Sequence, residues 1–239
     1  MTLPLRKSQA WDEPRGAMLL AGERAVCDWR GALWLPDCAA LVVSDLHLEK
    51  GSSFARRGVL LPPYDTAATL ARLGTVIDDY RPQVVISLGD SFHDGGGAAR
   101  MPDIFRVHLT TLMAGREWFW ISGNHDPDPP EGLGGVFAGE VSIGPLVFRH
   151  EPARGRCPGE VAGHLHPGAR IVRQGRSVRR PCFASDGERL VMPAFGSLTG
   201  SLNVLDRAYS ALFDWGRFTA HVLGADRVYA LNRSVLYPG

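Results

Sequence analysis

Lysine is almost absent from this sequence, and neither sign of charge dominates it. Lys7 and Lys50 are the only lysines, so nearly all of the 26 basic side chains are arginines. Against 25 acidic side chains they leave a formal net charge of +1 at pH 7. A balance this close to neutral indicates neither a general attraction to nucleic acid nor a general repulsion from it. Bulk charge therefore excludes no class of partner.

Cysteine pairs and long apolar runs are also missing. The four cysteines, at positions 27, 38, 157 and 182, form no Cys-x-x-Cys pair, which argues against a zinc ribbon. We expect free thiols in a reducing compartment. No apolar run approaches the roughly 18 residues that a membrane span needs. Residues 1–7 are followed by polar and charged residues rather than by the apolar segment of a signal peptide. These absences predict a cytoplasmic protein with no membrane segment.

The length and composition suit one globular domain. Of the 239 residues, 45% are hydrophobic and 21% are charged, which is ordinary for a protein with a full core. We predict a single domain over residues 1–239. Residues 1–17 are polar and contain Pro4 and Pro14, so we expect a loosely ordered lead-in there.

The first half of the chain alternates between strand and helix patterns. Strands are predicted over residues 39–43, 84–88 and 118–121, and amphipathic helices over 65–79 and 101–113. Asp65 is the expected N-cap of the first helix. This alternation predicts parallel βαβ units. Short strands are expected earlier, over residues 17–21, 25–29 and 32–34, with a hairpin turn at residues 29–32.

The second half carries shorter apolar segments separated by glycine turns. Strand-like segments lie at residues 141–150, 160–162, 170–173, 177–183 and 189–192, and two more are expected at 208–215 and 218–223. They predict a second, mostly antiparallel sheet. Residues 49–63, between the predicted strand at 39–43 and the predicted helix at 65–79, are expected to form a loop.

Polar residues follow three of the predicted parallel strands at the points where the strands end. The three strands are followed by Ser-Asp-Leu-His (44–47), Gly-Asp (89–90) and Gly-Asn-His-Asp (123–126). In open α/β sheets, ligands gather at the carboxyl ends of strands. We therefore expect these side chains to meet at one edge of the sheet, around Asp90.

These residues and three later histidines form a candidate metal site. Carboxylates, imidazoles and an amide suit Mn²⁺, Fe²⁺ or Zn²⁺ better than they suit a thiolate zinc site. A carboxylate shared by two ions, for which Asp90 is the candidate, gives the geometry of two-metal hydrolysis. A strand would hold His164 and His166 apart along its length, whereas a turn at Gly163 and Pro167 could direct both to neighbouring ions. The candidate ligands are Asp45, His47, Asp90, Asn124, His150, His164 and His166.

The order of these motifs resembles that of the calcineurin-like metallophosphoesterase superfamily. The resemblance rests on residues 44–47, 89–90, 123–126 and 163–166, and on the isolated His150. It implies a four-layer α/β/β/α sandwich of two mixed sheets, of which the strand pattern alone predicts only the parallel half. It also implies two ligand sets that share one carboxylate: Asp45, His47, Asp90 and His166 for one ion, and Asp90, Asn124, His150 and His164 for the other.

The same resemblance implies catalytic roles for two further histidines. The counterpart of His125 faces the substrate and acts as general acid to the leaving oxygen, and such an acid needs a neighbour that fixes its tautomer and pKa. Many phosphatases of the superfamily carry Asp three residues after the bridging Asp. This chain has His93 there, as the double-strand-break repair nucleases of the superfamily do. We therefore take His93 as the second catalytic candidate, with Asp94 as the alternative partner that orients His125.

A closer resemblance covers about residues 40–205. Residues 44–50, 56–58, 89–94, 150–152, 163–167 and 193–200 resemble the bacterial ligase-associated DNA damage response endonuclease family, PdeM. This resemblance implies an Mn²⁺-dependent phosphodiesterase with two divalent ions, acting on DNA and associated with a DNA ligase and a helicase. One position departs from the family: Glu49 precedes Lys50 where we expect Gly, which leaves the shape of that loop open.

Two groups of arginines are candidates for phosphate contacts. Arg56 and Arg57 follow the first ligand loop, and we take them as candidates for binding substrate. Five more arginines lie between residues 170 and 180, around a Gln-Gly turn and shortly after His166. A basic hairpin there could follow a nucleic-acid backbone. Solvated arginines without a binding role are the alternative at both places.

The favoured function is a metal-dependent phosphodiesterase or nuclease that acts by two-metal activation of water, on DNA in a repair context. A phosphatase or phosphodiesterase for a small nucleotide or metabolite is the alternative. A non-catalytic metal-binding scaffold is disfavoured, because the chain retains every expected ligand and His125.

Overall fold

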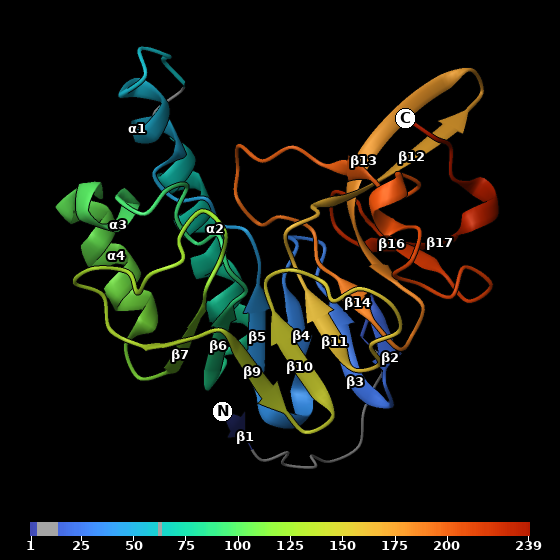
Figure 1. Ribbon diagram of the computed structural model, residues 1–239, viewed down its shortest axis with the longest axis horizontal. Helices are drawn as coiled ribbons and strands as arrows, with labels where there is room; N and C mark the ends of the chain where they lie inside the picture. The colour runs from blue at the N-terminus through green and yellow to red at the C-terminus, as the bar shows by residue number, and fades with distance from the viewer. Residues whose placement is uncertain (4–13, 62–63) are drawn as a thin grey trace.

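The computed structural model describes residues 1–3, 14–61 and 64–239. The described chain forms two β-sheets that pack face to face, with helices against the outer face of the first (Figure 1). Most of the predicted lead-in, residues 4–13, lies outside the described residues. The two mixed sheets with their helices confirm the predicted α/β class and the sandwich of two sheets.

The first sheet combines an antiparallel half with a parallel half. Its strands follow the order β2-β3-β4-β5-β6-β7-β8, antiparallel up to β5 and parallel from β5 onward. The predicted parallel units and the early hairpin turn are therefore confirmed. The strands are β2 (Ala17–Leu20), β3 (Glu23–Cys27), β4 (Leu33–Leu35), β5 (Ala40–Val43), β6 (Val84–Ser87), β7 (Glu117–Ile121) and β8 (Val136–Ala138).

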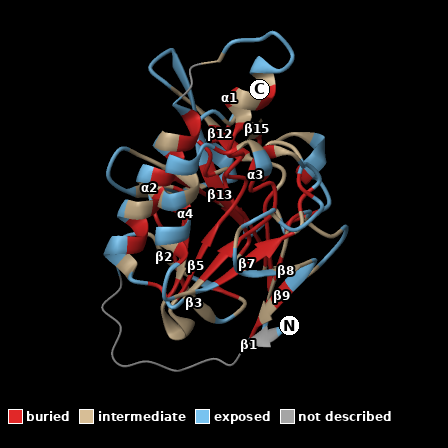
Figure 2. Cartoon of the chain, turned by 90° about the vertical axis from the view of Figure 1, so that its left-hand side faces the viewer, coloured by how far each residue is buried: buried red, intermediate tan, exposed pale blue. Residues whose placement is uncertain are grey.

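The central parallel strands β5, β6 and β7 are buried on both faces, and alternate side chains explain why. On β5, Ala40 and Val42 belong to the core between the sheets, whereas Leu41 and Val43 pack under the helices. Successive side chains of a strand point to opposite faces, so a strand covered on both sides is apolar throughout. Figure 2 shows this burial in the strands, while α2 and α4 expose their outer sides.

The helices cover the outer face of the first sheet. They are α1 (Lys50–Ala55), α2 (Asp65–Tyr80), α3 (Gly97–Arg100) and α4 (Asp103–Met113). The two long helices match the prediction, but α1 lies inside the segment predicted as a loop. Asp65 is the first residue of α2 rather than its N-cap, which is Tyr64. The Asp65 carboxylate instead accepts a hydrogen bond from the backbone N–H of Gly51 at 2.9 Å and so joins α1 to α2.

The second sheet is more mixed than predicted. In this sheet β11 pairs parallel with both β10 and β14, and the segment expected as one strand over 141–150 is a hairpin of two strands, β9 and β10. Among the described residues its strands are β1 (Thr2–Leu3), β9 (Glu140–Ile143), β10 (Leu146–Arg149), β11 (Glu160–Ala162), β12 (Pro167–Arg173), β13 (Arg176–Ser185), β14 (Leu190–Val191), β15 (Leu202–Asn203), β16 (Thr219–Leu223) and β17 (Val228–Asn232).

The strand predicted over residues 208–215 is wrong. This segment holds the short 3-10 helix η2 (Arg207–Tyr209) followed by turns, whereas β16 confirms the strand expected next to it. Its buried side chains, Tyr209, Leu212 and Phe213, recur at the spacing of a helical turn rather than at every second residue. They pack on the outer face of the second sheet as a third apolar cluster. The remaining short helices are η1 (Pro36–Cys38) and η3 (Arg233–Val235).

No helix in the described part of the chain is long and apolar enough to cross a membrane.

A buried ion pair helps to hold residues 207–215 against the second sheet. Glu160 and Arg189 are 0% and 1% exposed, and Arg189 Nε lies 2.7 Å from Glu160 Oε2. The guanidinium also donates to the carbonyls of Leu212 and Ala153, each at 2.9 Å. Because a buried charge without its partner is strongly unfavourable, each member of the pair depends on the other.

We predict that Arg189→Met lowers the free energy of unfolding by about 3–5 kcal/mol, because it removes the nearer of two cationic partners of the buried Glu160 carboxylate and leaves only Arg149, whose Nε lies 3.7 Å from Oε1. Adding Glu160→Gln should recover part of that loss. Urea denaturation followed by tryptophan fluorescence measures both. The control is Arg217→Met, since Arg217 pairs with Glu188 at the surface and such pairs contribute less than about 1 kcal/mol. Equal losses at the two arginines would contradict the prediction.

Candidate metal centre

The predicted motif residues meet where strands of both sheets end. Asp45 follows β5, Asp90 follows β6 and Asn124 follows β7, whereas His150 follows β10 and the two remaining histidines lie between β11 and β12. Backbone hydrogen bonds hold these loops to one another: His47 N donates to the Asp90 carbonyl at 2.9 Å, and Gly163 N donates to the His150 carbonyl at 2.9 Å. The structure therefore brings all seven candidate ligands to one edge.

The ligand loops have an unusual backbone. Residues other than glycine rarely adopt positive φ, although Asp, Asn and His do so more readily than most. Each such residue costs about 1–3 kcal/mol and persists only where its surroundings impose it. The turn expected between Gly163 and Pro167 is present, because both of its histidines are left-handed. The candidate ligands with positive φ are Asp45 (51°), His47 (44°), Asp90 (46°), His164 (67°) and His166 (46°).

One group of ligand atoms comes from Asp45, His47 and His166, whose nearest donor atoms all lie within 4.8 Å of one another. His166 Nε2 lies 3.1 Å from Asp45 Oδ1. Asp45 is fully buried, and its Oδ2 accepts hydrogen bonds from Ser44 Oγ and from the backbone N–H of His164. Burial lowers the pKa of His47 to about 3 despite the charges of Asp45 and Asp90. His47 is therefore neutral, as a metal ligand must be.

A second group is formed by Asp90, Asn124, His150 and His164. His150 Nδ1 donates to the Leu88 carbonyl at 3.0 Å, so in the neutral ring the lone pair is on Nε2 and faces the group. That Nε2 lies 2.9 Å from Asn124 Oδ1, 3.2 Å from His164 Nδ1 and 3.4 Å from Asp90 Oδ2. Oxygen and nitrogen lone pairs that converge in this way repel one another unless a positive charge lies between them.

The electrostatics of this second group call for a cation. Burial opposes a charge on His150, but the hydrogen bond to Asp90 and the charge of Asp45 outweigh it and raise the pKa of His150 to about 9. The two carboxylates thus draw a proton onto a buried imidazole. A divalent ion would supply that positive charge through coordination instead. The donor set of carboxylates, imidazoles and one amide oxygen therefore fits Mn²⁺, Fe²⁺ or Zn²⁺.

Asp90 lies between the two groups. Its Oδ2 is 3.4 Å from His150 Nε2 in the second group and 4.0 Å from His47 Nε2 in the first. Burial opposes its ionisation, but the hydrogen bond and charge of His150 and the backbone N–H of His125 lower the pKa of Asp90 to about 2. Asp90 is therefore a carboxylate at neutral pH that faces both groups at once.

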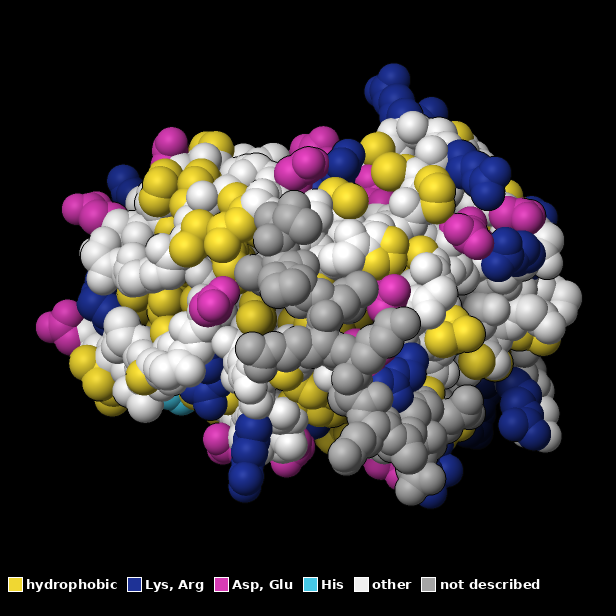
Figure 3. Space-filling model, turned by 90° about the horizontal axis from the view of Figure 1, so that it is seen from below, with side chains coloured by type: hydrophobic (Ala, Val, Ile, Leu, Met, Phe, Trp, Pro, Cys, Tyr) yellow, Lys and Arg dark blue, Asp and Glu magenta, His cyan; other side chains and the backbone are white. Residues whose placement is uncertain are grey.

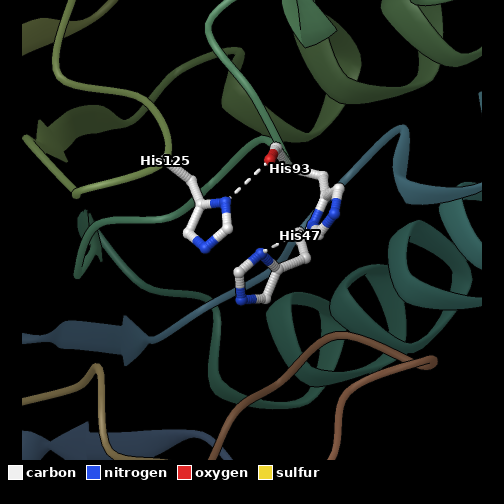
Figure 4. A group of neighbouring side chains, drawn as sticks. All are labelled: His47, His93 and His125. Carbon is white, nitrogen blue, oxygen red and sulfur yellow. Dashed lines mark hydrogen bonds between the residues drawn. The ribbon is translucent and has the colours of Figure 1, made fainter. Parts of the chain in front are cut away.

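His125 stands at the open side of the site, next to His93 and His47 (Figure 4). Its Nδ1 donates to the backbone carbonyl of His93 at 2.9 Å, so Nε2 is the free nitrogen and lies 3.9 Å from Asp90 Oδ2. The rings of His93 and His125 stack with centroids 5.1 Å apart. The partner of His125 is thus the backbone of residue 93, which no side-chain motif could predict.

Asp94 is engaged elsewhere. Its two carboxylate oxygens accept from Arg100 Nη1 and Nη2 at 2.7 and 2.9 Å, and the hydrogen bond to Arg100 holds the pKa of Asp94 well below its usual range. The sequence left open whether Asp94 or His93 orients His125. Of these two residues, the structure shows His93 in contact with His125 and Asp94 paired with Arg100.

The candidate substrate arginines lie outside both groups. Arg56 and Arg57 are exposed where α1 ends. Glu49, just before α1, has a left-handed backbone with φ of 62°, which explains why glycine was expected there. Its buried carboxylate accepts from Thr66 Oγ1 at 3.0 Å, so this loop holds a glutamate at a position that suits glycine.

Sequence reasoning missed three residues that support the site. Ser44 donates to Asp45, and Tyr209 donates from its hydroxyl to the carbonyl of Leu165, between the two loop histidines, at 2.9 Å. Asp126 is buried and accepts from Phe92 N at 3.0 Å, and burial foremost raises its pKa to about 7. Ser44 and Asp126 lie inside the motifs and could have been singled out. Tyr209 lies far along the chain and carries no local signal.

Gly163 allows the second sheet to approach Asp45. A Cβ at this position would overlap Ser44 Oγ and lie 2.6 Å from Asp45 Oδ2. We predict that Gly163→Ala displaces Asp45 and weakens Mn²⁺ binding about 10- to 100-fold, the range typical of lost support behind a ligand. Isothermal titration calorimetry measures the affinity. Gly134→Ala is the control, since a Cβ there meets nothing within 4 Å. Unchanged affinity in Gly163→Ala would show that this contact does not hold Asp45.

Comparison with known proteins places this arrangement in a family. The family model described as calcineurin-like phosphoesterase matches residues 40–181, which include the loops after β5, β6, β7, β10 and β11. The chain is also similar to the crystal structure of Pseudomonas putida nuclease MPE, with a TM-score of 0.69 and 26% sequence identity over 91% of this chain and 100% of that one. No curated protein matches the chain. Because the family model covers more than half of its length, the chain belongs to the calcineurin-like phosphoesterase family.

Proposed function

We propose that this protein is a two-metal phosphodiesterase that cleaves DNA. Phosphoester hydrolysis follows from its family, and the proposal adds the two ions, the diester bond and the polymer. The observation that carries it is the position of Asp90, whose Oδ2 faces His150 at 3.4 Å and His47 at 4.0 Å. One carboxylate shared in this way suits the pair of ions, about 3.5–4 Å apart, that two-metal hydrolysis uses.

The proposed ligands divide into the two groups described above. When bound, two divalent ions would supply Lewis-acid chemistry, which activates water near neutral pH and neutralises phosphate oxygens. We expect Mn²⁺, with Fe²⁺ or Zn²⁺ as alternatives. One ion would be held by Asp45, His47, Asp90 and His166, and the other by Asp90, Asn124, His150 and His164.

His125 is the proposed general acid. The His93 carbonyl accepts from its Nδ1, so a protonated His125 can release only the proton on Nε2 toward the substrate. The leaving oxygen of the diester would take that proton as its bond to phosphorus breaks. The stacked ring of His93 limits rotation of His125, and Arg56 and Arg57 are proposed to contact the phosphate chain beyond the site.

DNA is favoured over a small nucleotide by two observations. The chain resembles a protein named as a nuclease over 91% of its length. In addition, the His125 side chain is 39% exposed, so the leaving group would lie at the surface, where a long polymer can extend. A repair context, with functional association with a DNA ligase and a helicase, is part of the same proposal.

We predict that, with Mn²⁺, the protein hydrolyses bis-p-nitrophenyl phosphate much faster than p-nitrophenyl phosphate, and that it nicks supercoiled or single-stranded DNA. Rates of p-nitrophenol release and gel electrophoresis measure the two activities. Asp90→Asn is the control, because it removes the shared charge and should abolish turnover and most Mn²⁺ binding. Preference for the monoester would contradict the diesterase, and hydrolysis of small nucleotides without DNA cleavage would favour the alternative function.

We predict that His125→Asn lowers kcat on DNA by about 10²- to 10⁴-fold, the usual contribution of a positioned general acid. Its effect on bis-p-nitrophenyl phosphate should be smaller, because the aryl oxide leaves as a weakly basic anion that needs no proton. Mn²⁺ affinity should stay near that of the unchanged protein.

The control for this variant is His108→Asn on α4, which removes a histidine outside the site. Equal losses on both substrates in His125→Asn would argue that His125 supports the site without donating a proton.

A further inference from the structure

A two-stranded arm rises from the metal centre. Strands β12 and β13 pair antiparallel from Gly168–Pro181 to Arg173–Arg176, and the hairpin projects beyond the sandwich at the same end of the molecule as α1 (Figure 1). Its first strand begins at Pro167, directly after the candidate ligand His166. The arm therefore follows the site directly in the chain, with no linker between them.

The arm is strongly basic, although the whole chain is nearly neutral. No Asp or Glu occurs between Glu160 and Asp186. The opposite end of the molecule differs: Figure 3 shows basic and acidic side chains mixed over that face. Within residues 161–185 positive charge is therefore not balanced by any carboxylate of the same segment, unlike at that end of the molecule. The arginines of the arm are Arg170, Arg173, Arg176, Arg179 and Arg180.

The strand register sorts these arginines onto two faces. Arg170 pairs with Arg179 across the hairpin, and this face turns to the end of the chain, since Arg170 Nη1 donates to the Pro238 carbonyl at 2.7 Å. Arg173 pairs with Arg176, and Arg180 lies on that same face because side chains alternate along a strand. These last three arginines are exposed and have no acidic partner among the described residues.

We propose that the face formed by Arg173, Arg176 and Arg180 binds the phosphate backbone of duplex DNA whose scissile bond lies at the metal centre. This inference rests on the proposed function for the identity of the polymer. One guanidinium group can bind two phosphate oxygens at once. Three guanidinium groups without acidic partners suit a ligand that carries regularly spaced anions. The arm rises roughly 24 Å over the seven residues of β12, which is about seven base pairs of duplex.

An anionic lipid surface is the other polyanion that arginines could meet. Interfacial membrane binding usually adds large apolar side chains that enter the bilayer, and the tip of the arm is Gln174 and Gly175. The arm also begins directly after His166, so a polymer bound to it can extend to the site, whereas a membrane on the tip cannot. The geometry therefore favours nucleic acid.

The test compares R173Q/R176Q/R180Q with the matched triple R81Q/R207Q/R227Q, which removes three exposed arginines outside the arm. For a duplex about two helical turns long, the arm triple should raise KM at least tenfold and leave kcat little changed. Its salt dependence, log(kcat/KM) against log of salt concentration, should be shallower by about 3, one for each lost phosphate contact. The control triple should match the unchanged protein in both.

Two further measurements separate the possible failures. Bis-p-nitrophenyl phosphate is too short to reach the arm from the metal centre. The arm triple should therefore hydrolyse it at a rate within about twofold of the unchanged protein. If the unchanged protein hydrolyses neither substrate, the proposed function fails. If the arm triple cleaves the duplex with unchanged KM and salt dependence, the arm inference is overturned. Loss of binding to phosphatidylserine vesicles without any change toward DNA would assign the arm to membranes and also overturn it.

Discussion

The site depends on two buried carboxylates that share one small volume with four imidazoles. Asp45 is fully buried and Asp90 nearly so, and two negative charges at that depth are costly without compensation. Two of the histidines respond to these charges differently. Burial keeps His47 neutral, whereas the carboxylates raise the pKa of His150 to about 9. Divalent ions would satisfy both tendencies, because neutral imidazoles and ionised carboxylates are the forms that coordinate metal.

Holding those charges together requires the loops of two sheets to approach more closely than side chains normally permit. A Cβ on Gly89 would overlap the ring of His150, one on Gly123 would overlap the backbone of Asp90, and one on Gly163 would overlap Ser44. Each glycine of the motifs therefore marks a contact between loops that come from different strands. Part of the conformational cost of this close approach lies in the left-handed backbone of the candidate ligands. The packed sheets beneath these loops hold the arrangement in place.

The sequence could predict those parts in which local pattern and tertiary structure agree. The apolar runs of β5, β6 and β7 and the amphipathic α2 are stabilised by the same burial that their patterns indicate, and the polar residues after each strand follow from parallel topology. The second sheet was less predictable, since strands as short as β14 and β15 contain two residues each and derive their order from their neighbours. The segment 208–215 is predicted as a strand because its aromatic side chains have high strand propensity in isolation, whereas in the fold it forms turns that cover the second sheet.

The same distinction applies within the site. That the candidate carboxylates, imidazoles and amide would meet could be predicted, because their types and order are stated by the sequence and the strands bring them to one edge. The orientation of His125 could not, because its partner is a carbonyl that every residue possesses; only the fold decides that residue 93 presents it. Tyr209 illustrates the same limit over a longer distance, since its hydroxyl reaches the Leu165 carbonyl across 44 residues of chain. His125 and the ligand loop at 163–166 thus owe their positions to backbone hydrogen bonds, so their precision comes from the stability of the two sheets and not from any additional motif.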